Sequence, residues 1–284
     1  MSKPFLNCDS SVILKSDVSK GRRGVFTGDK IKAFRKASDS EKCDDAIRNV
    51  SLDQFVAMLE QFSAKDASGK PLYNAVRIYF GAFPDTAGSL HVPAGKAGFP
   101  TLLFVPTTGD LNKPAIGDIV TSMYFYIDEK GKATADKDGV AAGWIGNFND
   151  NWVPILNDDG ESETEDDFDE TRTLIYPIDS IAGDGVKEIG LLGLITCGRR
   201  DTENPITGLD ILFSCFTTSE TEKTLQHPYQ LSLIFHMPQK NDPTGVSFGS
   251  VKYKLGLVDA DTGMPCPPNG NCQSKSAFVK SGGK

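Results

Sequence analysis

Two cysteines and a histidine in the second half of the chain have side chains that could bind a metal ion or act in catalysis. Cys197, Cys215 and His236 lie near the ends of three apolar runs with the composition of strands. If those strands are neighbours, the three side chains converge and could bind zinc, or a Cys–His pair could supply a nucleophile. Their wide spacing along the chain favours the alternative that the cysteines are small buried hydrophobes. His236 would then be a histidine at a strand end, satisfied by backbone groups.

The middle of the sequence holds a dense run of carboxylates. Nine of the thirteen residues from Asp158 to Glu170 are acidic and none is basic, while the whole chain has a formal charge of −8. A helix–loop–helix calcium site does not fit, because aligning Gly160 with the loop glycine puts Ile155 at the first ligand position. Calcium bound by an irregular loop remains a weaker alternative.

Carboxylates packed this closely repel one another, so the run is expected to be a solvated linker or a surface insertion. As an acidic patch it could also bind a basic protein partner. The candidate partner-binding residues are Asp158, Asp159, Glu161, Glu163, Glu165, Asp166, Asp167, Asp169 and Glu170.

A third stretch, GVSFG at 245–249, matches the G-x-S-x-G pattern of hydrolase nucleophile elbows. That elbow needs a strand before the serine, a helix after it and a histidine later in the chain. Here a strand-like run follows Ser247, and all three histidines precede it. We therefore interpret GVSFG as a glycine-rich hairpin. The CPPNGNC stretch at 266–272 could close a disulfide or form part of a metal site, within a flexible C-terminal tail.

Periodicity outlines the elements that must position these residues in the first half. Ser51 and Gln54 match a capping box, and the apolar residues of 52–62 recur at helical spacing, which predicts a helix packed on a sheet. Strands are predicted at 74–83, where Val76, Ile78 and Phe80 alternate with Arg77 and Tyr79, and at the apolar runs 101–107 and 118–128. A short helix is expected at 29–37, and a strand with a loop at 139–152.

The second half is dominated by strand-like runs. Five predicted strands have the sequences TRTLIYPID, KEIGLLGLITC, LDILFSCFT, PYQLSLIFHM and VKYKLGLVD, and one short helix is expected at 219–226. The predicted fold class is an α+β first half, with a mixed sheet and one or two helices, followed by a mostly β second half. The expected division is an α+β domain at 1–156, an acidic linker or insertion at 157–170, a β domain at 171–265 and a tail at 266–284. The rival is a single domain with the acidic run as an insertion.

Composition excludes some classes of function. No apolar run is long enough for a membrane span, and the first residues lack the pattern of a signal peptide. The expectation is a cytoplasmic protein with reduced thiols. The negative charge argues against a nucleic-acid partner, because binding phosphates needs a basic face. VRIYFGAF followed by LLFVPT resembles a bacterial domain of unknown function, and that resemblance implies no residue roles.

Two classes of function stay open. The first is a non-catalytic binding or assembly protein that recognises a protein partner or itself through strand edges and the acidic run, without a cofactor. The second is an enzyme with a Cys/His or metal-dependent hydrolytic site in the C-terminal half, built on Cys197, Cys215 and His236.

Overall fold

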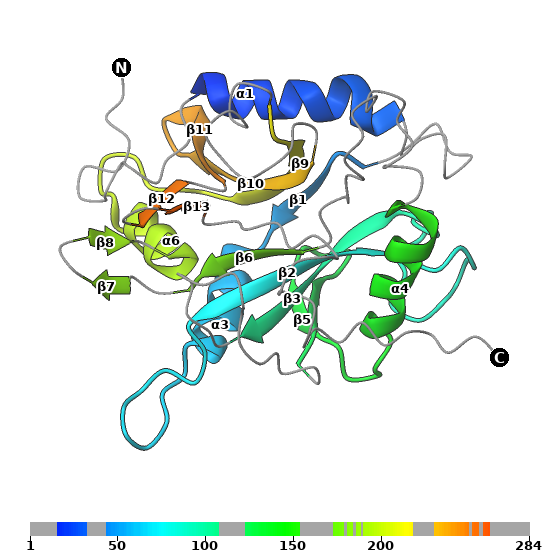
Figure 1. The fold of residues 1–284 in the computed structure, drawn as a ribbon, viewed down its shortest axis with the longest axis horizontal. Helices are drawn as coiled ribbons and strands as arrows, with labels where there is room; N and C mark the ends of the chain where they lie inside the picture. Colours follow the sequence, from blue (N-terminus) through cyan, green and yellow to red (C-terminus); the bar gives the residue numbers. More distant parts are fainter. Residues whose placement is uncertain are drawn as a thin grey trace.

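Two antiparallel sheets form the centre of the protein. The computed structural model describes residues 16–32, 44–107, 123–153, 173–178, 181–183, 186–188, 190–217, 230–249, 252–255 and 258–261. Within these residues one sheet has four strands and the other has five, and helices pack around them (Figure 1). The predicted α+β class is confirmed, although both sheets are antiparallel rather than mixed.

The four-stranded sheet brings together strands from both ends of the chain. Its order is β1 (Ala46–Val50), β9 (Leu209–Cys215), β10 (Leu231–Gln239) and β11 (Asp242–Gly249). Successive side chains of a strand point to opposite faces. Ile211, Phe213 and Cys215 of β9 accordingly lie in the core, and Asp210 lies on the outer face.

The five-stranded sheet has the order β5 (Ala133–Ala135), β4 (Phe125–Ile127), β3 (Pro100–Thr107), β2 (Ala75–Ala82) and β6 (Thr173–Pro177). Every residue of β2 and β3 is buried. A strand covered on both faces reads as a continuous apolar run, which is how β3 was predicted. β2 was predicted from its alternation instead, with Arg77 expected on the polar side, but Arg77 is buried as well. Two small strand pairs complete the described β structure, β7 (Ile181–Gly183) with β8 (Val186–Glu188) and β12 (Lys252–Leu255) with β13 (Val258–Asp261).

Aromatic rings from both sheets meet in one apolar core. Phe80 of β2 lies 6.1 Å from Phe213 of β9, measured between ring centroids, and Tyr176 of β6 makes an edge-to-face contact with Phe235 of β10 at 5.2 Å. Phe55, from the helix α3 (Leu52–Phe62), touches Phe104 of β3 and Phe235 of β10. The core therefore joins the two sheets into one packing unit.

The helix predicted at 52–62 is confirmed as α3. The side-chain oxygen of Ser51 accepts a hydrogen bond from the amide of Gln54 at 3.5 Å, which is half of the predicted capping box. The amide of Ser51 donates instead to the carbonyl of Gly131, in the turn between β4 and β5, at 2.7 Å. A tertiary contact thus satisfies the donor that the sequence assigned to Gln54.

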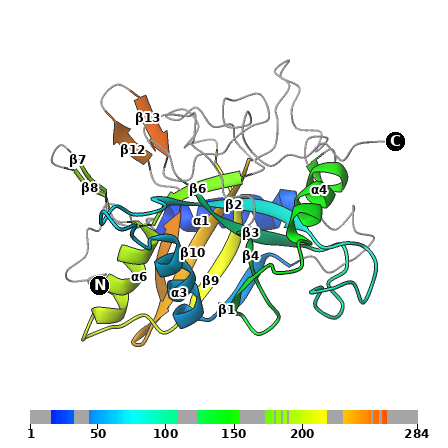
Figure 2. The same ribbon diagram turned by 90° about the horizontal axis from the view of Figure 1, so that it is seen from below.

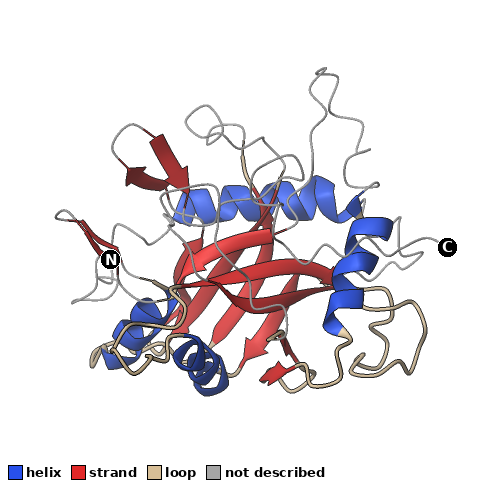
Figure 3. Ribbon diagram, turned by 60° about the horizontal axis from the view of Figure 1, so that its bottom comes forward, coloured by secondary structure: helices blue, strands red, loops and turns tan. Residues whose placement is uncertain are grey.

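Three further helices of the described ranges pack around the sheets. They are α1 (Ser16–Val25), which leads into a π-helical turn η2 (Phe26–Lys30), α4 (Ala141–Asn151) and α6 (Leu191–Arg200). Figure 1 shows α1 running along the four-stranded sheet, and α4 standing beside the ends of β2 and β3. In Figure 2, α3 and α6 lie next to each other, where Arg199 pairs with Asp53. The helices frame the paired sheets on several sides (Figure 3).

Two predicted strands are helices in the structure. KEIGLLGLITC was predicted as a strand from its apolar run, but Leu191–Arg200 forms α6 and buries Leu191, Leu194 and Ile195 at helical spacing. The strand and loop expected at 139–152 is the helix α4. The strand VKYKLGLVD is divided into β12 and β13. Residues 33–37 of the expected helix at 29–37, residues 118–122 of one strand, and the helix at 219–226 lie outside the described residues.

Strand pairing links the two sides of the expected domain boundary. Residues 154–172, which contain the acidic run, lie outside the described part of the chain. β2 pairs with β6, and β1 pairs with β9, so each sheet takes strands from before and after the run. Both sheets therefore span the expected boundary, and the division of the chain into domains stays a prediction. Within the described ranges, no helix combines the length and apolar character needed to cross a lipid bilayer.

Candidate functional site

Three polar side chains line up across the outer face of the four-stranded sheet. His236 of β10 is the register partner of Asp210 on β9 and of Ser247 on β11. Phe235 and Met237, on either side of His236, belong to the core, so the alternation of the strand turns His236 to the opposite face. Direct cross-strand partners have Cβ atoms about 5 Å apart. We call Asp210, His236 and Ser247 the polar row.

His236 is the titratable centre of the polar row. Its Nδ1 lies 3.3 Å from Oγ of Ser247, within hydrogen-bond distance. Burial lowers the pKa of His236; the charge of Asp210 acts to raise it and that of Arg48 to lower it further. The net pKa lies below the usual 6.5, so the imidazole is neutral at neutral pH. A neutral ring has one nitrogen able to accept a proton from the Ser247 hydroxyl.

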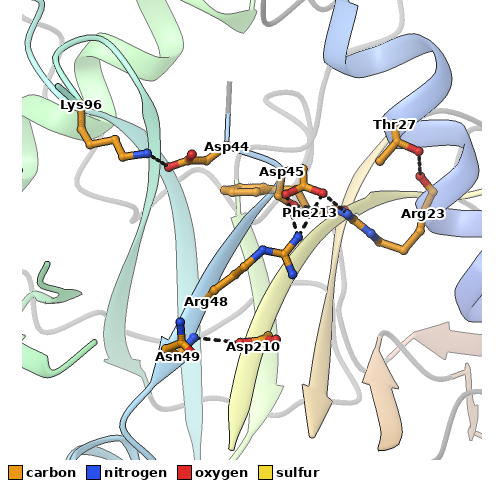
Figure 4. Close-up of polar contacts among 9 residues, drawn as sticks. All are labelled: Arg23, Thr27, Asp44, Asp45, Arg48, Asn49, Lys96, Asp210 and Phe213. Carbon is orange, nitrogen blue, oxygen red and sulfur yellow. Dashed lines mark hydrogen bonds and ion pairs between the residues drawn. The ribbon is translucent and has the colours of Figure 1, made fainter. Parts of the chain in front are cut away.

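Asp210 is held by the backbone of β1 rather than by the histidine. Its Oδ1 accepts a hydrogen bond from the amide of Asn49 at 2.8 Å (Figure 4). Asn49 has a φ of 56°, a left-handed conformation that asparagine tolerates better than most residues. The register between β1 and β9 shifts between Ile47 and Val50, which is where this irregular residue lies. Asp210 thus stabilises the bulge in β1, and it acts on His236 through its charge rather than through a hydrogen bond.

A charged cluster adjoins the polar row and anchors α1. Asp45 accepts hydrogen bonds from the guanidinium groups of Arg23 and Arg48, and Arg23 also donates to the main-chain carbonyls of Asp45 and Phe213 (Figure 4). Burial acts to raise the pKa of Asp45, but the two guanidinium groups outweigh it, and the pKa ends below its usual value. Arg23 therefore ties the first helix to β1 and β9.

The exposed members of this region form a surface next to the polar row. The side chain of Arg48 is 54% exposed, and Asn49 is also exposed. Lys96, from the long loop between β2 and β3, pairs with Asp44 just before β1 (Figure 4). Positive, negative and neutral hydrogen-bonding groups therefore lie close together around the start of β1 (Figure 4).

The structure does not bring Cys197, Cys215 and His236 together. Cys197 lies on α6 and is disulfide-bonded, so its sulfur is neither a thiolate ligand nor a nucleophile. Cys215 is buried in the core, and its register partner on the neighbouring strand β10 is Leu231. Leu231 lies five residues before His236 on that strand. At about 3.3 Å per residue, that offset is roughly 16 Å along the strands, and the two side chains point to opposite faces. Among the residues that the structure describes, no group of three His, Cys, Asp or Glu side chains is arranged to hold a metal ion.

The contact between His236 and Ser247 was not predicted from the sequence. Ser247 lacks the following helix that a nucleophile elbow requires, and β11 indeed continues as a strand through Gly249. Two strands joined by a tight turn place their residues opposite each other in register order. A turn at 240–241 between two strand-like runs was the signal that could have paired His236 with Ser247.

A second histidine contact, between His91 and Asp138, joins two loops beside the five-stranded sheet. Nε2 of His91 is 2.6 Å from Oδ2 of Asp138, and its ring centroid lies 5.5 Å from that of Tyr126. His91 has a φ of 62°, and Leu90 before it is one of the two exposed large apolar residues of the described chain. Asp136 accepts hydrogen bonds from four backbone amides at the start of α4 and thereby holds the loop that carries Asp138. The pair serves to fasten the β2–β3 loop onto the loop before α4.

The nine acidic residues of 158–170, together with His227, Cys266 and Cys272, lie outside the described residues. Comparisons of the chain with protein-family models, with curated proteins and with solved structures find no match.

Proposed function

We propose that the chain is a non-catalytic binding protein that docks a protein partner, or a second copy of itself, at the polar row and the adjoining Arg48 and Asn49 of its four-stranded sheet. The observation that supports this proposal is the alignment of Asp210, His236 and Ser247 beside the exposed Arg48 and Asn49. These groups offer donors and acceptors on a surface whose backbone is fixed by sheet pairing. Such polar, preorganised surfaces give an interface its register and selectivity.

The experiment compares the assembly state of the wild type with that of two alanine variants. Arg48→Ala removes an exposed guanidinium from the proposed surface, and Lys65→Ala removes an exposed cation from the loop after α3. Native mass spectrometry and light scattering would report subunit number and any co-purified protein. We expect the wild type to form an oligomer or a stable complex that Arg48→Ala weakens at least tenfold and Lys65→Ala leaves intact. A monomeric wild type without a partner, or equal effects of both variants, would refute the proposal.

The acidic run is proposed as a second interaction surface, for a basic protein segment. Its support is the concentration of nine carboxylates in thirteen residues. Replacing Asp158, Asp159 and Glu161 by Asn or Gln should weaken such a complex and flatten its salt dependence, without changing the urea midpoint. Binding that is unchanged at low salt would contradict this role.

A serine hydrolase is the second candidate function, and the 3.3 Å contact between His236 and Ser247 favours it. In this alternative the neutral imidazole of His236 takes the proton of Ser247, whose oxygen attacks an acyl group. Against it, Oδ1 of Asp210 bonds to the amide of Asn49, and Ser247 lies within a strand. A fluorophosphonate probe followed by intact-mass measurement separates the two candidates. Labelling that is lost in Ser247→Ala and retained in Ser63→Ala would establish the hydrolase.

A cytoplasmic location stays a proposal, and the disulfide at Cys197 argues against it. Disulfides persist in oxidising compartments and are rare in the cytosol, where thiols are kept reduced. Fractionation of the native host, with thiol alkylation before lysis, tests both the location and the redox state of Cys197.

A further inference from the structure

The central strand of the five-stranded sheet carries a buried arginine without an acceptor. Arg77 lies in β2 and is only 1% exposed. Its neighbours Val76 and Ile78 belong to the core between the sheets, so the side chain of Arg77 lies on the opposite, outer face of the five-stranded sheet. Its register partners on that face are Val105 of β3 and Ile175 of β6.

No described residue accepts a hydrogen bond from Arg77. The atoms Nε, Nη1 and Nη2 are all buried and all lack a partner there. The ring of Tyr79 lies 6.0 Å from the guanidinium carbon, at the outer limit of a cation–π contact. Arginine stays charged in proteins, so it cannot relieve its burial by losing a proton. An uncompensated buried charge is strongly destabilising, and a contact with one distant ring does not offset it.

A second orphan donor lies on the same face of the sheet. Thr173 of β6 is 1% exposed, and its Oγ1 has no hydrogen-bond partner among the described residues. Thr173 is the register partner of Tyr79, two residues along β2 from Arg77, so Thr173 and Arg77 are diagonal neighbours. Diagonal neighbours lie about 7–8 Å apart, within reach of a long side chain. The two groups can therefore contact one small ligand.

We propose that Arg77 and Thr173 form a binding site for an oxyanion, the phosphate or carboxylate group of a small molecule. A guanidinium presents its donors as a planar fork that matches two oxygens of such a group, and the threonine hydroxyl adds a third contact. An oxyanion supplies the negative charge and the acceptors together. Water could satisfy the donors but would leave the charge uncompensated. This site is on the other sheet from the polar row and does not depend on it.

Inorganic phosphate and acetate are the probes, with chloride at equal ionic strength as the reference. We expect at least one probe to raise the melting temperature of the full chain in a saturable manner, with one site by calorimetry. Arg77→Lys, which keeps the charge but loses the fork, should weaken binding at least tenfold. Thr173→Val should weaken it about fivefold, the loss of one hydrogen bond. Arg200→Met, at an exposed arginine in the last turn of α6, should leave the affinity unchanged.

The second measurement is whether Arg77→Met raises or lowers the melting temperature. Arg77→Met keeps the volume and removes the charge, so it should raise the melting temperature of the protein without ligand and abolish the response to phosphate or acetate. A lower melting temperature in Arg77→Met would show that the chain itself supplies a carboxylate to Arg77, and that result would overturn the proposal. Equal binding of the probes by wild type and Arg77→Met, or no binding by wild type, would overturn it as well.

Discussion

Replacement of Gly131 by alanine tests how the turn between β4 and β5 holds the polar row in place. Gly131 has a φ of 74°, and a Cβ built on it would lie 2.2 Å from the carbonyl oxygen of Asn49. The same two segments are joined by the hydrogen bond from the amide of Ser51 to the carbonyl of Gly131. Asn49 in turn donates its amide to Asp210. An added methyl group must therefore displace the backbone of Asn49, whose amide donates to Asp210.

The magnitude follows from three contributions. An alanine in the left-handed region costs about 1–2 kcal/mol. Moving the backbone of Asn49 away breaks the Ser51–Gly131 hydrogen bond, worth about 1 kcal/mol, and the bond from Asn49 to the Asp210 carboxylate, worth about 1.5–3 kcal/mol. We expect Gly131→Ala to lower the free energy of unfolding by about 3–5 kcal/mol, after partial relaxation.

Gly139 provides the matched control. Its φ is 72°, but a Cβ built there would have no heavy atom within 4 Å. Gly139→Ala should therefore show only the conformational cost of about 1–2 kcal/mol.

Urea denaturation followed by tryptophan fluorescence and by circular dichroism gives both values, since Trp144 and Trp152 report on α4. The reasoning fails if the two variants differ by less than about 1 kcal/mol, because the close approach at Gly131 would then carry no energy.

Three other measurements test separate features. Phe55→Ala should lower the free energy of unfolding by about 3–5 kcal/mol. Because Phe55 contacts both sheets, fluorescence and circular dichroism should still follow a single cooperative transition. Two separate transitions would mean that the sheets do not share a core. Burial lowers the pKa of His236, so the unfolded chain binds more protons than the native state below pH 6.5, and stability should fall as the pH drops from 6.5 towards the native pKa. His236→Gln should remove that part of the pH dependence, and an unchanged slope would contradict the assignment. Without reductant, alkylation should leave Cys197 unmodified, and reduction should lower the free energy of unfolding by about 2–4 kcal/mol; ready alkylation of Cys197 in the native protein would show that the thiol is free.

The elements that sequence predicts well here are those whose burial pattern is unambiguous. α3 has a capping residue and a complete apolar stripe, β2 alternates apolar residues over its length, and β3 has a continuous apolar centre. α6 was misassigned because a short apolar run is compatible with a strand or a buried helix. α4 begins without a capping side chain at Val140, so no start signal separates it from a loop.

The candidate site could be predicted only in part, because register decides it. Ser247 and His236 were each identified from their residue types, but their contact depends on a turn at 240–241 that places them opposite each other. Asp210 enters the row through β9, which is adjacent to β10 in space but separated from it by residues 216–230 in sequence. Arg77 resembles any polar residue of an alternating strand, and only the fold shows that its face of the sheet is buried. Pairing between distant segments carries no local signature in the sequence.

The pairing of β1 with β9 has a consequence for how the protein is made. β1 ends at Val50, and its only partner strand among the described residues begins at Leu209. At about 5–20 residues per second, a ribosome needs roughly 8–30 seconds to synthesise the intervening segment. During that interval β2, β3 and β6 are translated in turn, but β9 is not, so β1 has no partner strand. The nascent chain thus exposes unpaired strand edges for many seconds, and its yield in a cell should depend on chaperones that cover them.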